Sequence, residues 1–347
     1  MDEIRAGVIG VGGFFGNVHL PCLRRIAGLR LVAACARRES SRAKAAKQIA
    51  DDRVKLYADF RDLLADKDVN AVYVLTPPAA MLEIVREVAK ARLPLFCEKP
   101  PGSTSQDARQ MADACAEAKL NHLVAFNRRF GPFTDRTRQW LAEAGPATRI
   151  EISFRRTFSK CPTALVGNGI HAIDLMISLL GPVRRVMSAR AAQRGGEGFS
   201  HFHAALQFAG GASGTFNYDN RMATPAEEYH ISCVSEDTFT VSQLDLVFPT
   251  PTKVRQPCKV VRRKLVYRDW GPGGAIFDTL SDEFVVPELA DRAEDDLLIG
   301  GGYLGEHEAF AASLRGGPAG APTFDQTVHS MEVAETIQAG LYREFDT

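Results

Sequence analysis

The stretch RAGVIGVGGFFGNVHLPCL, residues 5–23, decides the fold. It opens with an apolar run typical of a buried strand and passes through a glycine cluster into apolar residues at helical spacing. Gly10 and Gly12 permit a tight turn and a close approach of the backbone to a pyrophosphate, which the amides at the start of a helix would then face. We therefore predict a dinucleotide-binding turn with contacts from Gly10, Gly12, Gly13, Phe14 and Phe15.

The spacing of this turn departs from the usual pattern by one residue. The glycines follow G-x-G-x-x-x-G in place of G-x-G-x-x-G, because Phe15 holds the sixth place and Gly16 the seventh. A glycine cluster alone is weak support for ligand binding, since many tight turns contain one, and a merely structural turn is the alternative interpretation. The strand before the cluster and the helix after it favour the dinucleotide interpretation.

Short apolar runs alternate with helical patterns over the first 126 residues. Continuous apolar strands between helices are typical of a parallel, doubly wound sheet, whose strand ends gather at one ligand-binding edge. Ser103 and Gln106 fit a capping box for a helix over 104–118. The runs predicted as strands are 5–10, 29–36, 70–78, 93–97 and 122–126.

From about residue 148 the pattern changes to an alternation of apolar and polar residues, which indicates an antiparallel sheet with one covered face. An apolar helix is predicted over 169–181, whereas 242–302 is rich in Pro, Gly and charge and receives no assignment. We predict an N-terminal domain over 1–126 and a C-terminal α+β domain over 127–347 with a large open, mostly antiparallel sheet. Whether the last helices pack back on the first domain is left open.

The composition and charge of the chain limit which partners, metal sites and cellular location we expect. The formal net charge is zero and no long run of one sign occurs, so we expect neither a nucleic acid nor an anionic membrane as a partner. The sequence contains no stretch of eighteen uncharged apolar residues, so we expect no transmembrane helix. The N-terminus does not show the pattern of a signal peptide. The seven cysteines are scattered without a CxxC pair, which favours reduced thiols in a cytoplasmic protein and no metal site.

The end of the second apolar run bears on the choice of cofactor. An NAD site would place an acid here to bind the ribose hydroxyls, but Ala36 stands at that place. Arg37 and Arg38 are suited to clamp a 2′-phosphate, and Ser41 offers a further donor. Two solvated arginines in a surface turn are the alternative. The pattern favours NADP, with NAD possible.

The run LPLFCEKPPGST, residues 93–104, places charge at the end of a buried strand. Lys99 would point into the ligand edge of the sheet, where two prolines restrict the backbone. A lysine there can hydrogen-bond a reacting oxygen and relay a proton beside a nicotinamide. A surface lysine paired with a carboxylate is the alternative interpretation.

Five motifs in this order, GVGGFFGNVHLPCL, LTPP, CEKPPGST, AFNRRF and GIHAIDLMISLLG, resemble the glucose–fructose oxidoreductase / inositol dehydrogenase / rhizopine-catabolism (Gfo/Idh/MocA) family. The resemblance implies a Rossmann domain followed by a mixed α/β domain whose open sheet often forms the subunit interface. A homodimer or homotetramer through the C-terminal sheet is therefore expected. It also implies hydride transfer between NAD(P) and a hydroxyl or keto group of a sugar or cyclitol.

The resemblance carries roles onto individual residues. Lys99 and His171 match the catalytic lysine and histidine of the family, and Glu98 matches the glutamate that contacts the nicotinamide ribose. The Lys99–Pro100 bond is often cis in relatives. Thr76 and Pro77 are placed among the cofactor contacts. Asn127 and Arg128 match residues that line the substrate pocket, and Asn127 is also counted as a cofactor contact. Apart from the resemblance, Arg155 or Arg156 could bind an acidic or phosphorylated substrate; adjacent strand residues point to opposite faces, so at most one of them faces the pocket. We count Arg156, together with Asn168, among the expected substrate contacts.

Some residues depart from the family pattern or stay ambiguous. Pro78 and Met81 replace an Asn and a His, and Gly167 stands where the family often has an Asp four residues before His171. Asp174, one helical turn after His171, is interpreted as structural or as orienting the imidazole. Other candidates are weaker: a strand pair at 201 and 203, and possible pocket residues at 303 and 307.

These observations leave three hypotheses. The first is an NADP-dependent oxidoreductase acting on a sugar, an amino or nucleotide sugar, or a cyclitol. The second is a non-catalytic, dinucleotide-sensing regulator or scaffold of the same fold, which the missing Asp would explain. The third is a reductase of a non-sugar group, and the pairing of Lys99 with His171 ranks it last.

Overall fold

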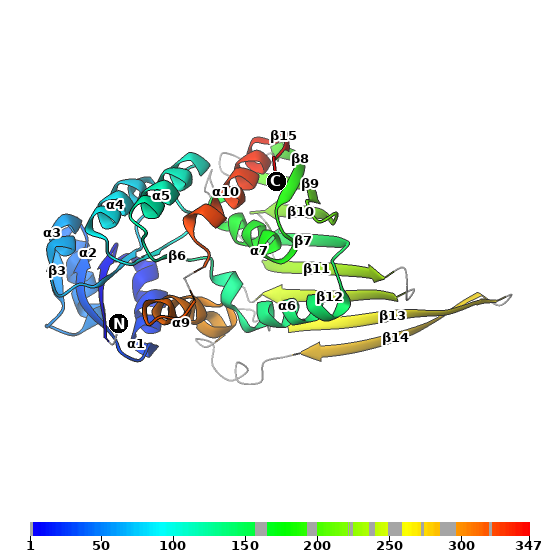
Figure 1. Ribbon diagram of the computed structural model, residues 1–347, viewed down its shortest axis with the longest axis horizontal. Helices are drawn as coiled ribbons and strands as arrows, with labels where there is room; N and C mark the ends of the chain where they lie inside the picture. The colour runs from blue at the N-terminus through cyan, green and yellow to red at the C-terminus, as the bar shows by residue number, and fades with distance from the viewer. Residues whose placement is uncertain are drawn as a thin grey trace. The chain divides into compact units, whose positions relative to one another are not determined.

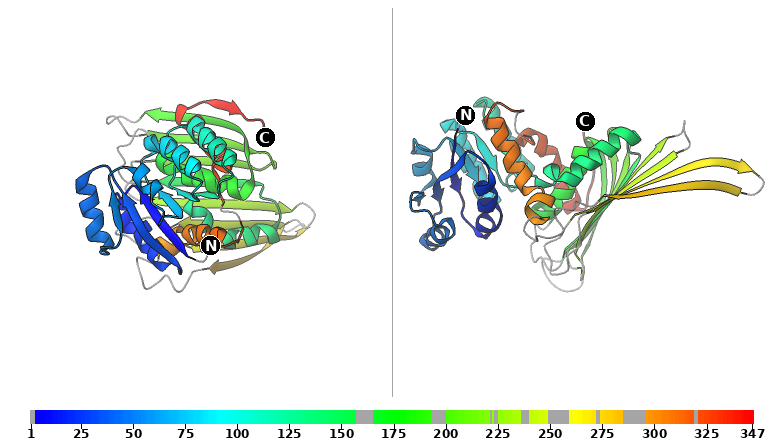
Figure 2. Two further views of the ribbon diagram at one scale, coloured as in Figure 1. Left: turned by 60° about the vertical axis from the view of Figure 1, so that its left-hand side comes forward. Right: turned by 90° about the horizontal axis from the view of Figure 1, so that it is seen from below.

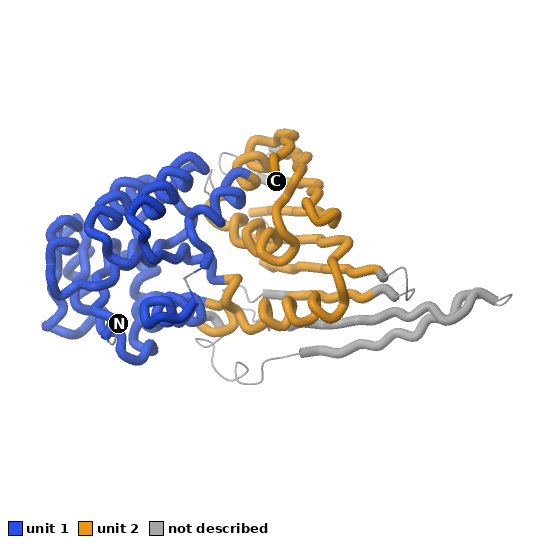
Figure 3. Tube along the Cα trace, viewed as in Figure 1, with its two compact units in different colours: residues 1–127, 303–332 blue, residues 128–302, 333–347 orange. Residues whose placement is uncertain are grey.

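The computed structural model divides the chain into two compact units (Figure 3). One unit comprises 1–127 and 303–332, and the other comprises 128–302 and 333–347. The residues that the structure describes are 3–156, 165–192, 200–220, 222, 225–235, 240–248, 259–271, 274–284, 296–318 and 321–347.

The first unit is built on a six-stranded parallel sheet with the strand order β3-β2-β1-β4-β5-β6. The predicted doubly wound sheet is confirmed. One short strand, Lys55–Tyr57, was not predicted because it lies in no apolar run. The strands are β1 (Ile4–Ile9), β2 (Leu29–Cys35), β3 (Lys55–Tyr57), β4 (Ala71–Val74), β5 (Leu95–Cys97) and β6 (His122–Val124).

Helices cover both faces of this sheet, and its central strands are therefore buried along their length (Figure 1). Helix α4 packs beside α5, and α1 packs beside α9 from the C-terminal part of the chain. The helices of this unit are α1 (Leu20–Arg25), α2 (Glu39–Ile49), α3 (Phe60–Ala65), α4 (Pro78–Ala91), α5 (Ser105–Glu117) and α9 (Tyr303–Leu314).

The capping box of α5 lies one residue later than predicted. The Thr104 hydroxyl accepts from the Asp107 backbone N–H at 3.1 Å, and the Asp107 carboxylate accepts in return from the Thr104 N–H at 3.1 Å. The predicted pair, Ser103 and Gln106, is wrong because Thr104 offers an equivalent hydroxyl in the next position. Asp107 also binds the Ser103 N–H, so one carboxylate organises the whole start of the helix.

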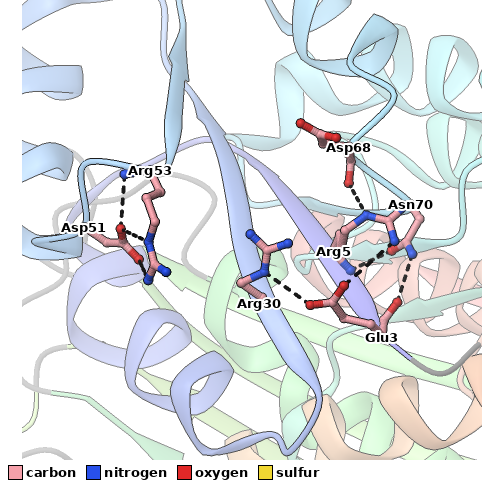
Figure 4. Close-up of polar contacts among 7 residues, drawn as sticks. All are labelled: Glu3, Arg5, Arg30, Asp51, Arg53, Asp68 and Asn70. Carbon is pink, nitrogen blue, oxygen red and sulfur yellow. Dashed lines mark hydrogen bonds and ion pairs between the residues drawn. The ribbon is translucent and has the colours of Figure 1, made fainter.

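Polar contacts tie the start of β1 to the loop that precedes β4 (Figure 4). The Arg5 backbone N–H donates to Asn70 Oδ1 at 2.7 Å, and Asn70 Nδ2 donates to the Glu3 carbonyl at 2.9 Å. The Arg5 guanidinium donates to the Asp68 carbonyl at 2.7 Å. These bonds satisfy backbone groups at the end of the strand opposite to the glycine turn.

The second unit is built on a nine-stranded sheet in the order β14-β13-β12-β11-β7-β10-β9-β8-β15. Strands β7 and β10 pair in parallel, and the other described pairs are antiparallel, which confirms the mostly antiparallel sheet. Its strands are β7 (Arg149–Arg155), β8 (Val183–Ala192), β9 (Ser200–Phe208), β10 (Ser213–Asp219), β11 (Ala226–Ser235), β12 (Thr240–Phe248), β13 (Lys259–Gly271), β14 (Gly274–Phe284) and β15 (Tyr342–Glu344).

The region 242–302, which received no assignment from the sequence, supplies most of three of these strands, β12, β13 and β14. Charged residues interrupt the apolar positions of the stretch KVVRRKLVYRDWG, so no clean period of two is visible. Pairing with β11 through β12 extends the sheet outward regardless of the local pattern. Tertiary pairing has thus overridden a weak local signal.

Helices α6 (Pro132–Ala144) and α7 (Ile170–Leu180) lie on one face of the nine-stranded sheet (Figure 2). Along β7, Ile150, Ile152 and Phe154 are buried on the covered face, and the residues between them are half-buried. Helix α10 (Phe324–Ala339) runs from one unit into the other.

Within the part of the chain that the structure describes, no helix has the length and apolar character needed to cross a bilayer. Cysteines 161 and 258 lie outside the described residues. The other five are buried free thiols, namely Cys22, Cys35, Cys97, Cys115 and Cys233.

Candidate functional site

The glycine turn follows β1 at the carboxyl edge of the parallel sheet. Gly10 has φ +102°, and a Cβ there would lie 2.7 Å from the Leu75 carbonyl oxygen, so only glycine fits. A Cβ on Gly12 or Gly13 would meet no atom within 4 Å. The space beside these two glycines is therefore open, which a close approach of a pyrophosphate requires.

The extra residue of the turn is absorbed in a π-helical turn. Residues Phe15–His19 form this turn, which continues directly into α1, and the Leu20 N–H donates to the Phe15 carbonyl five residues back. A π-turn accommodates one more residue than an α-turn and is frequent at functional sites. The unusual glycine spacing thus leaves the strand–turn–helix unit intact.

The two phenylalanines of the turn lie in different environments. Phe14 is 44 % exposed, and its ring lies 5.6 Å from that of Tyr303 in an edge-to-face arrangement. Phe15 is 1 % exposed and belongs to the core. Of the two predicted contacts, Phe14 therefore offers a side chain, whereas Phe15 offers only its backbone.

Replacing Gly12 with alanine is expected to leave the melting temperature near that of the wild type and to weaken NADPH binding by about ten-fold or more. The added methyl group meets no protein atom but occupies the space offered to the pyrophosphate. Gly10→Ala is the contrasting variant, because its methyl group collides with the backbone at Leu75 and lowers stability. Calorimetry and fluorescence titration distinguish the two; equal NADPH affinity in Gly12→Ala and wild type would contradict the assignment.

A cleft of about 540 Å³ opens beside the glycine turn. It brings together residues from the ends of β1, β2 and β4, which the sequence separates by up to 67 positions (10 to 77). Six predicted cofactor contacts line it, namely Gly10, Arg37, Arg38, Ser41, Thr76 and Pro77.

The charged side chains that line this cleft differ in whether they form ion pairs. Asp59 and Glu83, which also line it, both pair with Arg61, at 3.6 and 2.6 Å. Arg37 and Arg38 are exposed, and within the described residues neither guanidinium has an ion-pair partner. Their positive charge is therefore available to a ligand.

The turn that carries these two arginines is held by a third, which the sequence did not single out. Arg42 Nη1 donates to the carbonyls of Ala36 and Arg37 at 2.7 and 2.8 Å. A helical residue five and six positions downstream of these carbonyls thus satisfies the backbone of the turn and fixes its direction. An arginine within the first turn of α2 was the only available signal.

Glu98 and Lys99 follow β5 at the same carboxyl edge of the sheet. The Lys99–Pro100 bond is cis. Glu98 is 8 % exposed; its Oε2 accepts from the Lys99 backbone N–H at 2.8 Å and its Oε1 lies 3.0 Å from His19 Nε2. His19 was not predicted as a site residue, although its place at the end of the glycine motif could have indicated it.

His171 lies in the first turn of α7 in the second unit and is 5 % exposed. Asn168, in the π-helical turn before it, is half-buried, and a Cβ on Gly167 would meet no atom within 4 Å. Asp174 is fully buried, and both of its oxygens accept from Arg129 at 2.7 Å. Of the two interpretations of Asp174, this pair supports the structural one.

Arg128 and Arg156, both predicted substrate contacts, share one buried carboxylate. Arg128 binds Glu227 in a bidentate pair at 2.9 and 2.8 Å, and Arg156 Nη2 donates to Glu227 Oε2 at 3.3 Å. Arg155 pairs instead with Glu228, so the two adjacent arginines lie on opposite faces of the sheet. Glu227 was not predicted. Asn127, beside Arg128, is fully buried.

The histidines that were weaker candidates for site residues have hydrogen-bond partners in the structure. His201 lies 3.3 Å from Asp219 and His203 lies 2.6 Å from Asn217, in cross-strand pairs. In the described ranges no group of three or more His, Cys, Asp or Glu is placed to hold a metal. His307 is fully buried and hydrogen-bonded to His19, so it is not a pocket-lining residue.

A glycine turn between β1 and a helix, with an adjoining cleft at the carboxyl edge of a parallel sheet, defines a dinucleotide-binding protein of the Rossmann type. Residues 4–126 match the family described as an oxidoreductase family with an NAD-binding Rossmann fold, and residues 158–339 match its C-terminal alpha/beta domain. The chain belongs to this Gfo/Idh/MocA oxidoreductase family, and the resemblance found in its motifs is confirmed.

Several characterised proteins are similar to the chain. It is 28 % identical over 198 residues to the rhizopine catabolism protein MocA of Rhizobium meliloti, covering 52 % of this chain and 58 % of MocA. It is 30 % identical over 201 residues to D-apiose dehydrogenase of Paraburkholderia graminis, covering 54 % of this chain and 53 % of that enzyme. The aligned regions thus span little more than half the length of these relatives.

Solved structures share the fold over nearly the whole chain. An oxidoreductase from Agrobacterium radiobacter, in complex with NAD+, L-tartaric acid and magnesium, has a TM-score of 0.78 at 18 % identity and covers 99 % of this chain and 98 % of its own. The 3-ketoreductase KijD10 from Actinomadura kijaniata, in complex with NADP and TDP-benzene, has a TM-score of 0.74 at 18 % identity, covering 98 % of both chains. Identities this low establish the fold alone.

Proposed function

We propose that the protein is an NADP-dependent oxidoreductase that transfers hydride between nicotinamide and a hydroxyl or keto group of a sugar, an amino or nucleotide sugar, or a cyclitol. The observation that carries the proposal is the position of Lys99 and Glu98 at the carboxyl end of β5, on the sheet edge that also holds the glycine turn. Relatives named as dehydrogenases of levoglucosan, D-apiose and D-xylose support the class of substrate.

The residues of the chain divide the work of binding and proton transfer. The amides of the glycine turn bind the pyrophosphate, and the second lone pairs of the Glu98 carboxylate accept from the ribose hydroxyls. When bound, the nicotinamide ring supplies or accepts the hydride. Oxidation of an alcohol also releases one proton from oxygen; Lys99 holds that oxygen by a hydrogen bond and, with His171, takes up the proton, and the reverse holds in reduction.

Arg37 and Arg38 make NADP the preferred cofactor. Their guanidinium groups line the cleft and have no ion-pair partner in the described part of the chain. Ala36 stands in place of a carboxylate, and the acids that line the cleft are paired with Arg61. Charge-assisted hydrogen bonds to a phosphate are about twice as strong as neutral ones.

NADPH is therefore expected to bind at least about ten-fold more tightly than NADH, and Arg37→Ala should erase much of this difference by weakening NADPH alone. Fluorescence titration of both cofactors measures it. Arg53→Ala is the matched control, because Arg53 is an exposed arginine of the same unit that pairs with Asp51 away from the cleft (Figure 4). Equal affinities of the wild type for NADPH and NADH would refute the NADP assignment.

A panel of sugars, amino sugars, nucleotide sugars and cyclitols tested with NADP(H) decides between catalysis and sensing. Turnover of one class is the expected result. Tight NADPH binding with no turnover of any member would favour the alternative, a non-catalytic regulator or scaffold of the same fold, which the glycine at 167 in place of an Asp would explain.

We also propose self-association through the open face of the nine-stranded sheet. On this face cross-strand pairs such as His201–Asp219 and Arg155–Glu228 leave half-buried side chains in register along neighbouring strands. Sedimentation equilibrium is expected to give two or four times the chain mass. A monomer at micromolar concentration would contradict this assembly.

A further inference from the structure

A line of hydrogen bonds runs through the first unit from α9 to the loop after β5. His307 Nε2 lies 3.0 Å from His19 Nδ1, and His19 Nε2 lies 3.0 Å from Glu98 Oε1. Glu98 Oε2 accepts from the Lys99 backbone N–H at 2.8 Å. Both histidines are fully buried, so no water competes for these bonds. Residues 288 positions apart in the sequence are thereby joined to the candidate site.

Aromatic rings fix the plane of the His307 imidazole. Its ring stacks on Phe96 with centroids 4.6 Å apart and planes at 13°, and on Tyr73 at 5.5 Å and 19°. Phe96 belongs to β5 and Tyr73 to β4, so the central strands of the sheet hold this ring. Burial, together with the neighbouring His19, lowers the pKa of His307 well below its ordinary value. The ring is therefore neutral and carries one proton.

The position of that proton follows from the unused nitrogen. His307 Nδ1 is buried, and it has no hydrogen-bond partner among the residues that the structure describes. An unpaired buried N–H is costlier than an unpaired lone pair, so the proton sits on Nε2 and is donated to His19 Nδ1. His19 must then carry its own proton on Nε2 and donate it to Glu98. Glu98 therefore accepts from His19 on one oxygen and from the Lys99 amide on the other, and it is the acceptor at the end of the line.

We propose that His307 is a positioning residue for the dinucleotide site, acting through His19 to hold the Glu98 carboxylate in the orientation that meets the nicotinamide ribose. This inference rests on the proposed function. With one oxygen held by His19 and the other by the Lys99 amide, the carboxylate cannot rotate, and each oxygen keeps a second lone pair for an incoming hydroxyl. Helix α9 thus contributes to the site from the far end of the chain.

The variant His307→Phe tests the proposal, since phenylalanine keeps the stacked ring and removes the donor. We expect it to weaken NADPH binding by about ten-fold. Binding of 2′,5′-ADP, which lacks the nicotinamide ribose, is expected to stay unchanged. A general loss of structure would weaken both ligands equally, so the ratio of the two dissociation constants separates positioning from folding.

Two further variants sharpen the result. His307→Gln places an amide donor near the position of Nε2 and is expected to restore most of the NADPH affinity. His122→Phe is the matched control: His122 belongs to the same unit, and its ring stacks on Phe324 at 5.2 Å, but its described bonds go to the backbone at Leu120 and Phe324. It is expected to bind NADPH as the wild type does.

Imidazole nitrogen NMR of the wild type tests the same line without any variant. We expect the ring proton on Nε2, and a lone pair on Nδ1, in both His19 and His307. A proton on His307 Nδ1, or NADPH affinity unaltered in His307→Phe, would overturn the inference. Failure of the wild type to bind either NADPH or 2′,5′-ADP would instead contradict the proposed function, and the ring tautomers would still decide whether the hydrogen-bonded line exists.

Discussion

Lys99→Ala is expected to retain NADPH binding and to lower kcat by about a hundred- to ten-thousand-fold. The hydroxyl proton must leave as hydride leaves carbon, and without a lysine at this edge the developing charge on oxygen meets no cationic donor. Glu98 keeps both of its described bonds in the variant, because the bond from residue 99 comes from its backbone amide. The ribose contact is therefore preserved while the proton transfer is lost.

The measurement is steady-state turnover of the best substrate from the panel, together with NADPH titration. Lys90→Ala serves as the control, since Lys90 is an exposed lysine on α4 that pairs with Glu87 at 2.7 Å. It is expected to behave as the wild type. If Lys99→Ala turned over substrate at the wild-type rate, Lys99 would have no catalytic role, whatever the cofactor affinity.

Local sequence patterns were sufficient to predict most strands of the first unit, because these strands are buried on both faces. The apolar runs ending at Ile9, Cys35, Val74 and Cys97 are visible without any partner, and parallel order follows from the helices between them. Since the ligand edge of such a sheet is determined by topology, the positions of the glycine turn and of Lys99 could also be predicted.

What the sequence did not reveal depends on residues that are distant in the chain. Glu227 meets Arg128 from 99 positions away, and His307 meets His19 from 288 positions away, with no periodic signal to join them. The π-turn over 15–19 is a different case. The spacing of the glycines revealed one extra residue, but it did not reveal that a wider helical turn would accommodate that residue. Strands β12 to β14 pair with strands next to them in the chain, so distance did not hide them. They were missed because charged residues interrupt their apolar positions and leave no clean period of two.

Glu227→Gln is expected to lower the free energy of unfolding of the second unit by about 3–5 kcal/mol. Glu227 is fully buried between Arg128 and Arg156, whose side chains are 7 % and 18 % exposed, and Tyr229 also donates to it at 2.9 Å. Glutamine keeps the volume but removes the negative charge that the two desolvated guanidinium groups share. The neighbouring Glu228→Gln removes a carboxylate from a partly exposed pair with Arg155 and is expected to cost about 0–1 kcal/mol.

The pH dependence of the destabilisation by Glu227→Gln distinguishes the loss of a negative charge from a disturbance of packing. Burial would raise the pKa of Glu227, but the charge and hydrogen bonds of Arg128 outweigh it and hold the pKa below the ordinary 4.5. A lowered carboxyl pKa stabilises the folded state above the unfolded value, and this stabilisation is lost as pH falls through the folded pKa. The difference in urea midpoint between wild type and Glu227→Gln should therefore be largest at neutral pH and shrink below about pH 4.5. A difference independent of pH would mean that the variant disturbs packing, and that the two arginines do not need this charge.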